Sequence, residues 1–112
     1  MVLLFQTAFK HMKNAERSLE ANDYKSAAPL LEKASAIVVE LLCALNHEVA
    51  PELTGRLSDI YLFVTARITQ CLATKDVAKI REAQRAFAPL VEAFTAAVGS
   101  LGQSSQGAVG QG

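Results

Sequence analysis

The residues best suited to chemistry are two cysteines and two histidines: Cys43, Cys71, His11 and His47. Cys43 and His47 are four positions apart, so one helical turn would place a sulfur and a nitrogen ligand for zinc on the same face. No second pair of this kind completes a four-ligand site, and neither histidine follows a glutamate by three positions, as a di-metal centre in a helix bundle requires. We expect no metal and no cofactor, with the Cys43 and His47 pair as the one zinc alternative.

Catalysis by a cysteine nucleophile is also weakly supported. A reactive thiolate needs a positioned base and a group that orients that base, and no such pattern surrounds Cys43 or Cys71. Small apolar residues in or beside a core are the simpler interpretation of both cysteines. A glycine-rich phosphate loop is excluded as well, because Gly55 is the only glycine before Gly99. The sequence therefore predicts that the protein is not an enzyme.

Two short basic rows have the spacing of one helix face. Lys10, Lys13 and Arg17 follow an i, i+3, i+7 pattern, and Arg81 and Arg85 are four positions apart. Each row could face phosphates, but glutamates lie at neighbouring positions, and eleven basic residues are balanced by eleven acidic ones. We interpret both rows as solvated helix faces and expect no binding to nucleic acid.

The elements that carry these residues are helical. Apolar residues recur with a period of about 3.6 positions along the chain, and the pattern is interrupted at Asn22-Asp23, Asn46-His47 and Lys75-Asp76. Pro51 suits the first turn of one helix and Asp76 suits the N-cap of another. The predicted helices cover residues 2–21, 24–46, 51–74 and 76–98.

Short connections between helices of similar length favour antiparallel neighbours. The sequence therefore predicts an all-α protein, an antiparallel up-down four-helix bundle over residues 1–98. Residues 99–112, which are rich in Gly, Ser and Gln, are predicted to form a flexible, disordered C-terminal tail. Pro89 should kink the last helix at a cost of about 3 kcal/mol. Pro29 lies in the first turn if Ser26 is the N-cap, and it bends the helix if Asp23 is the N-cap.

No segment suits a signal peptide or a membrane span, although hydrophobic residues make up 51% of the chain. The N-terminal stretch "MVLLFQTAFKHMK" has no positive region before its apolar residues, and its charges begin at Lys10. Two cysteines are too few for a disulfide framework, so we interpret them as reduced thiols. We expect a cytoplasmic protein that is not inserted in a membrane.

The apolar run from Ile60 to Val64 is unusual for a soluble helix. At about 100° per residue, Leu62 and Phe63 lie about 140° and about 240° from Leu57, so they cannot both face a core. The second helix has an apolar arc of about 160°, wider than one packing contact requires. We predict an apolar groove between the second and third helices that binds another protein. Its predicted lining comprises Leu31, Val38, Leu42, Tyr61, Leu62, Phe63 and Leu72. The alternative is burial against the chain's own N-terminal segment, or one exposed aromatic residue without a function.

Two stretches resemble the flagellar export chaperone FliS family. In "AERSLEANDYKSAAPLLEKASAIVVELLCAL", the family pattern of an alanine, an Asp-Tyr pair and a long helix ending in Glu-Leu-x-x-x-Leu is met by Ala15, Asp23, Tyr24, Ala34, Ile37, Glu40, Leu41 and Leu45. In "LSDIYLFVTARI", the matching residues are Leu57, Ile60, Tyr61, Val64, Arg67 and Ile68. Leu62 stands where the family usually has Asp, and Phe5-Gln6-Thr7 stands where it usually has Tyr-Asp-Gly. The resemblance covers about residues 1–98.

The resemblance implies a bundle that holds the disordered C-terminal segment of flagellin in the cytoplasm and prevents premature filament assembly before export. The client would wrap around the bundle and form helices on its apolar surfaces. Other candidate partners are an export-gate component, a co-chaperone or a second copy of this chain as a homodimer. The alternative function is a helical interaction module or a self-associating bundle with another client. The stretch "AERSLEANDYKSAAPLLEKA" is similar to part of a tetratricopeptide unit, but no echo follows at the 34-residue period of such repeats.

Overall fold

The computed structural model describes the backbone of residues 2–46, 48 and 50–108, and the side chains of 3–46, 48 and 50–96. These residues form four helices and no strand: α1 (Val2–Glu20), α2 (Tyr24–Cys43), α3 (Pro51–Thr74) and α4 (Val77–Ala108). The predicted all-α class and the four helices are confirmed. The first three helices begin where the sequence predicts and end within three residues of the predicted positions.

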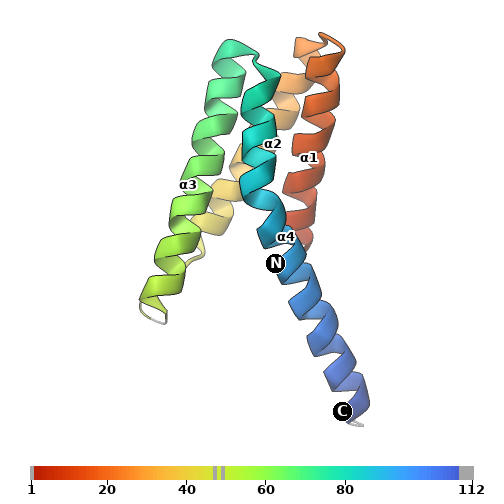
Figure 1. Cartoon of the computed structure of the whole chain (residues 1–112), viewed down its shortest axis with the longest axis vertical. Helices are drawn as coiled ribbons and strands as arrows, with labels where there is room; N and C mark the ends of the chain where they lie inside the picture. The colour runs from red at the N-terminus through yellow and green to blue at the C-terminus, as the bar shows by residue number, and fades with distance from the viewer. Residues whose placement is uncertain (1, 47, 49, 109–112) are drawn as a thin grey trace.

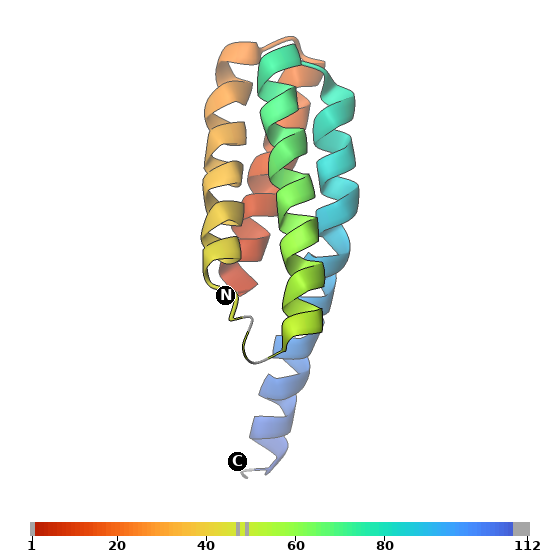
Figure 2. The same ribbon diagram turned by 90° about the vertical axis from the view of Figure 1, so that its left-hand side faces the viewer.

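Successive helices run in opposite directions, and the chain passes up and down the bundle (Figures 1 and 2). Each helix packs against two neighbours in the cyclic order α1, α2, α3, α4, and α4 closes the ring against α1. The C-terminal part of α4 extends past the ends of the other helices, at the end of the bundle where α1 begins and where α2 and α3 are joined. The described residues therefore form a bundle of four helices around a shared core.

Local capping fixes the sharp connection between α1 and α2. Asn22 has a φ of 59°, a left-handed conformation that asparagine tolerates better than most residues. The Asp23 amide donates to the Ser18 carbonyl and the Asn22 amide donates to the Leu19 carbonyl, which is the paired bonding of a Schellman motif. Asp23 then accepts a hydrogen bond from the Ser26 amide at 3.2 Å and acts as the N-cap of α2. At the start of α4, Asp76 accepts from the Ala78 amide at 3.0 Å, in agreement with its predicted capping role.

Both internal prolines lie on exposed sides of continuous helices. Pro29 lies inside α2, which begins at Tyr24 with Asp23 as its N-cap, and Pro89 lies inside α4. Because each side chain is exposed, the carbonyl that loses its helical partner can bond to water.

Helix α4 continues to Ala108, ten residues beyond its predicted end at residue 98. The extension contains Gly99, Gly102 and Gly107, and each glycine weakens a helix by about 1 kcal/mol relative to alanine, which is why the sequence favours an earlier end. Residues 109–112 of the predicted tail lie outside the described residues. The flexibility of the tail stays a prediction.

The core is built from small residues and a group of aromatic rings. Fully buried alanines from three helices, such as Ala8, Ala34 and Ala83, let the helices approach closely. Phe5 stacks against Phe87 at a centroid distance of 5.6 Å and against Phe94 at 4.5 Å. This aromatic group joins α1 to α4 and anchors the half of the bundle near the N-terminus.

Candidate partner-binding surface

One side of α3 carries no charged residue along its whole length. At about 100° per residue, this uncharged strip occupies a sector of about 120° on the helix. It is made of Pro51, Thr54, Gly55, Ser58, Leu62, Thr65, Ala66, Thr69, Leu72 and Ala73. Leu62, near its middle, has 52% of its surface exposed. A long uncharged surface with an exposed leucine has the composition to be covered by another apolar segment.

The threonine hydroxyls of the uncharged strip donate hydrogen bonds to main-chain carbonyls four residues earlier in the chain. Thr65 Oγ1 donates to the Tyr61 carbonyl at 3.0 Å, and Thr69 Oγ1 donates to the Thr65 carbonyl at 2.9 Å. Thr54 Oγ1 donates to the Ala50 carbonyl at 3.0 Å. Because the donors are already bonded, each oxygen can only accept further hydrogen bonds, and the methyl groups add apolar contact area. The strip is therefore less polar than its composition suggests.

The uncharged strip borders α2. At the end of the bundle where α1 and α2 are joined, Leu72 lines a small cavity with Ala28 and Leu31 of α2. At the same end, the Lys75 ammonium lies 5.5 Å from the centroid of the Tyr24 ring. By the same helical step, the side of α2 that borders α3 carries Ala28, Ser35, Val39 and Leu42, with Glu32 and Lys25 as the charged residues beside them. Val39 is 43% exposed. The seam between α2 and α3 thus offers mainly small and apolar groups from both helices.

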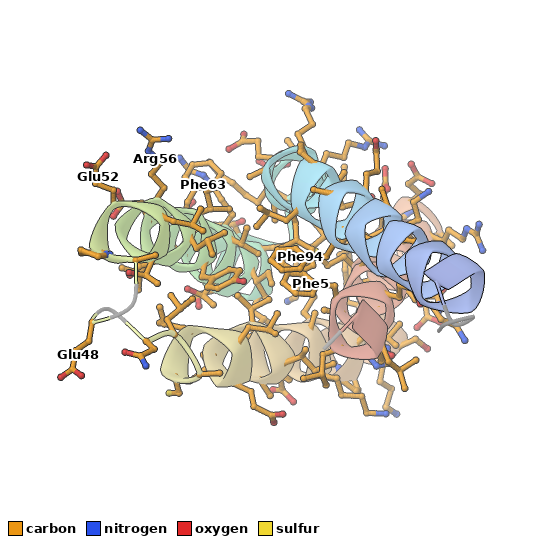
Figure 3. All side chains as sticks on the ribbon, turned by 90° about the horizontal axis from the view of Figure 1, so that it is seen from below. Phe5, Glu48, Glu52, Arg56, Phe63 and Phe94 are labelled. Atoms are coloured by element: carbon orange, nitrogen blue, oxygen red, sulfur yellow. The ribbon has the colours of Figure 1, made fainter. Side chains whose placement is uncertain are left out.

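An apolar cavity opens at the end of the bundle where α2 and α3 are joined. Its volume is about 150 Å³, and it is lined by Phe5, Leu41, Ala44, Leu45, Leu57, Tyr61 and Phe94. Figure 3 shows Phe5 and Phe94 side by side at this end, between the four helices. Leu53, in the first turn of α3, is 57% exposed. The end of the bundle can therefore accept an apolar side chain from outside.

The other outer side of α3 is charged. Phe63 lies on this side, and Figure 3 shows it on the outside of α3, away from the pair of core phenylalanines. The Arg67 guanidinium carbon lies 4.8 Å from the centroid of the Phe63 ring, and Arg67 Nε pairs with Glu82 Oε1 of α4 at 3.0 Å. Phe63 is therefore an exposed ring partly covered by its own neighbours, whereas Leu62 lies inside the strip with Asp59 as the charged residue at its edge.

A profile of the family described as "Flagellar protein FliS" matches residues 1–100, which is most of the chain. The chain belongs to the FliS family. Membership implies a role as a flagellar export chaperone, and this is a family of chaperones, not of enzymes. No curated protein matches the sequence significantly. Within the described residues, none of the helices combines the length and the hydropathy that a transmembrane segment needs.

In this FliS-family bundle, the seven predicted lining residues fall into three groups. Leu62 and Phe63 are exposed, and Leu42 and Leu72 are half-buried. Leu31, Val38 and Tyr61 have at most 2% of their surface exposed and belong to the core. The expectation that Leu31 and Val38 line an outer groove is therefore corrected. The apolar arc of α2 is wide because α2 packs against both α1 and α3, and this packing buries Leu31 and Val38. A partner-binding role for Leu42, Leu62, Phe63 and Leu72 stays a prediction.

Val39 and Leu53 are exposed apolar residues that sequence reasoning did not select. Val39 follows the core residue Val38, and a helical step of about 100° places it on the side of α2 toward α3. The signal was the pair of adjacent valines, one of which must lie outside a narrow core stripe. Leu53 fits the core period of α3, and only its place in the first turn, beyond the neighbouring helices, leaves it exposed.

No group of three or more metal-ligating side chains occurs in the part of the chain that the structure describes. Cys43 is exposed at the end of α2, and His47, its potential zinc partner, lies outside the described residues. Cys71 is fully buried, and burial raises the pKa of its thiol, which disfavours the nucleophilic thiolate. The geometry favours binding by apolar contact over chemistry.

Proposed function

We propose that this protein binds the disordered C-terminal segment of flagellin in the cytoplasm and prevents its premature polymerisation before flagellar export. The observation that carries the proposal is the uncharged strip of α3 beside α2, in a chain that belongs to a flagellar chaperone family. We place the client along this strip, where it covers Leu62, Val39 and the half-buried Leu42 and Leu72. An export-gate component, a co-chaperone and a second copy of this chain are further proposed partners at other stages of the cycle.

The size of the expected contact suits a releasable complex. Burial of each exposed leucine, valine or phenylalanine contributes about 1.5 to 3 kcal/mol. A segment that is disordered when free must also be ordered on binding, which costs about 2 to 5 kcal/mol of the gross interaction energy. Contacts with two exposed and two half-buried residues leave a small net favourable free energy that an export machinery can still reverse.

The direct test is isothermal titration calorimetry, in which a flagellin C-terminal peptide is added to the purified chain and the affinity is measured. A Leu62→Asp substitution should weaken binding at least about tenfold, because it removes an apolar contact and introduces an unpaired charge at the centre of the interface. A Val39→Asp substitution tests the α2 side of the seam in the same way. The matched control is Gln70→Asp, which adds the same charge at an exposed position of α3 outside the strip.

A Phe63→Asp variant, compared with Leu62→Asp, tests which of the two outer sides of α3 contacts the client. Phe63→Asp should weaken binding less than Leu62→Asp, because the ring lies on the charged side under Arg67. Equal affinities for wild type, Leu62→Asp and Val39→Asp, with unchanged helicity, would remove the strip from the client site. Light scattering of the free chain distinguishes the alternative, a self-associating bundle, from a monomer that awaits its client.

A further inference from the structure

A second groove lies on the opposite side of the bundle, between α1 and α4. It has a volume of about 370 Å³ and is lined by Gln6, Phe9, Lys10, Lys13, Asn14, Arg17 and Val91. The α1 helix contributes all of these residues except Val91. The groove therefore contains the basic row of Lys10, Lys13 and Arg17 that the sequence pattern places on one helix face.

The three cations of this row have no ion-pair partner among the described side chains. The nearby glutamates of α1 are engaged elsewhere: Arg81 of α4 pairs with Glu16 through Nε at 2.8 Å and with Glu20 through an Nη2 atom at 2.5 Å. Gln84 Nε2 also donates to Glu16 at 2.9 Å. Arg81 thus draws both carboxylates toward α4. The basic row therefore has no close ion pair with these glutamates, although the Lys13 charge still helps to lower the pKa of Glu16.

The floor of the groove is apolar. Phe9 and Val91 are half-buried and pack against the core cluster, and they separate the basic row from the interior. The Lys13 ammonium lies 5.3 Å from the centroid of the Phe9 ring, a cation–π contact that holds one charge at the edge of the groove. The amide groups of Gln6 and Asn14 complete the lining. The groove therefore combines an apolar floor with a cationic rim.

We propose that this groove binds an acidic amphipathic helix of a partner protein, separate from the flagellin segment assigned to the α2 and α3 seam. The row extends over seven helical steps, or about 10 Å of helix, so it matches carboxylates placed over two turns of a docked helix. Phe9 and Val91 would contact the apolar side chains between those carboxylates. This inference does not depend on the proposed function.

Charge complementarity distinguishes this occupant from a nucleic acid or a membrane. Three cations are enough for a few carboxylates, but the zero net charge and the neighbouring Glu92 disfavour an extended polyanion. The apolar floor adds contacts that a phosphate backbone cannot use. A short acidic helix with an apolar stripe uses both features of the groove.

The probe for the test is a synthetic 18-residue helical peptide of about five turns, with three glutamates on one row, leucines beside them and one tryptophan. The protein contains no tryptophan, so the fluorescence anisotropy of the peptide reports binding directly. We expect the wild-type chain to bind this peptide at least about fivefold more tightly than the same peptide with glutamines in place of the glutamates. Raising the salt concentration from about 0.05 M to about 0.5 M should remove most of that preference.

The variant Lys10→Gln/Lys13→Gln/Arg17→Gln should bind the acidic peptide about tenfold more weakly, since three exposed charge pairs each contribute a factor of about two. The matched control, Lys25→Gln/Lys33→Gln/Arg56→Gln, removes the same net charge from exposed positions outside the groove and should keep wild-type affinity. Circular dichroism confirms that each variant is folded. Equal loss in both variants, or no preference for glutamate, overturns the proposal. Binding to vesicles rich in phosphatidylserine or to duplex DNA without binding to the peptide also overturns it.

Discussion

His11 has a buried imidazole nitrogen, Nδ1, without a hydrogen-bond partner among the described residues. Its pKa is lowered from the usual 6.5, first by burial and then by the charges of Lys33 and Lys10. The unfolded chain therefore takes up a proton at a higher pH than the folded chain does. By linkage, the free energy of unfolding should be fully present above about pH 6.5 and should decrease as the pH falls through and below that value. Urea unfolding at about pH 7.5 and about pH 5.5 measures the decrease.

A His11→Gln variant is the control for this effect. Glutamine is polar but does not titrate, so the variant should lose less stability than the wild type between the two pH values. Carboxylates and any other histidine contribute equally to both proteins. An identical pH dependence in wild type and variant would show that His11 does not carry the effect.

The sequence shows which residues are apolar but does not show which of them the fold covers. Tyr61 and Leu62 are adjacent, and only the burial of one and the exposure of the other decides that Leu62 can meet a partner. Similarly, Glu16 and Glu20 are closer in sequence to the α1 cations than to Arg81, yet both pair with Arg81. The two glutamates pair with a residue more than sixty positions away, and Tyr61 is buried partly against Phe5 of another helix, so no local pattern contains either outcome.

The left-handed conformation of Asn22 ends helix α1 and should contribute to stability. An alanine at this position must adopt a left-handed φ, which costs about 1 kcal/mol relative to a residue that tolerates it. We therefore expect Asn22→Ala to lower the free energy of unfolding by about 1 kcal/mol. Glycine adopts this conformation without steric strain, so Asn22→Gly should stay within about 0.5 kcal/mol of the wild type. Chemical denaturation of the three proteins measures both values.

The comparison of these two variants isolates the backbone conformation. Both substitutions remove the 3.1 Å hydrogen bond from the Tyr24 hydroxyl to Asn22, so its loss cancels between them. Equal stability of the alanine and glycine variants would mean that the left-handed turn does not limit stability at this helix end.

The helices themselves were largely predictable because their signals are local. Asp23, Pro51 and Asp76 mark helix starts through capping and first-turn preferences that act within a few residues. The end of α4 was not predictable in this way, since its last turns carry glycines that weaken a helix without forbidding it. The orientation of α2 in the bundle could not be predicted either, because an apolar arc wide enough for two neighbouring helices does not show which of its residues stay exposed.

The two seams on opposite sides of the bundle differ in the balance of charged and apolar groups. The seam of α2 and α3 carries the uncharged strip, whereas the seam of α1 and α4 carries Arg81 with its two glutamates and the basic row of Lys10, Lys13 and Arg17. The two proposed partners, one bound by apolar burial and one by charge complementarity, would therefore occupy different sides of the bundle. A chaperone that must hold a client and also meet other proteins benefits from such independent surfaces.

If the proposed client folds on the bundle, binding must show the thermodynamics of folding. Circular dichroism of the chain mixed with the flagellin peptide should exceed the sum of the separate spectra in helical signal, because the peptide gains helices on the uncharged strip. Burial of about 1,000 Å² or more should make the heat-capacity change of binding negative by about 0.2 kcal/mol/K or more. Calorimetry over a range of temperatures gives this slope. An additive helical signal together with a flat enthalpy would mean that the segment stays disordered on the surface, and the apolar strip would then have to serve another partner.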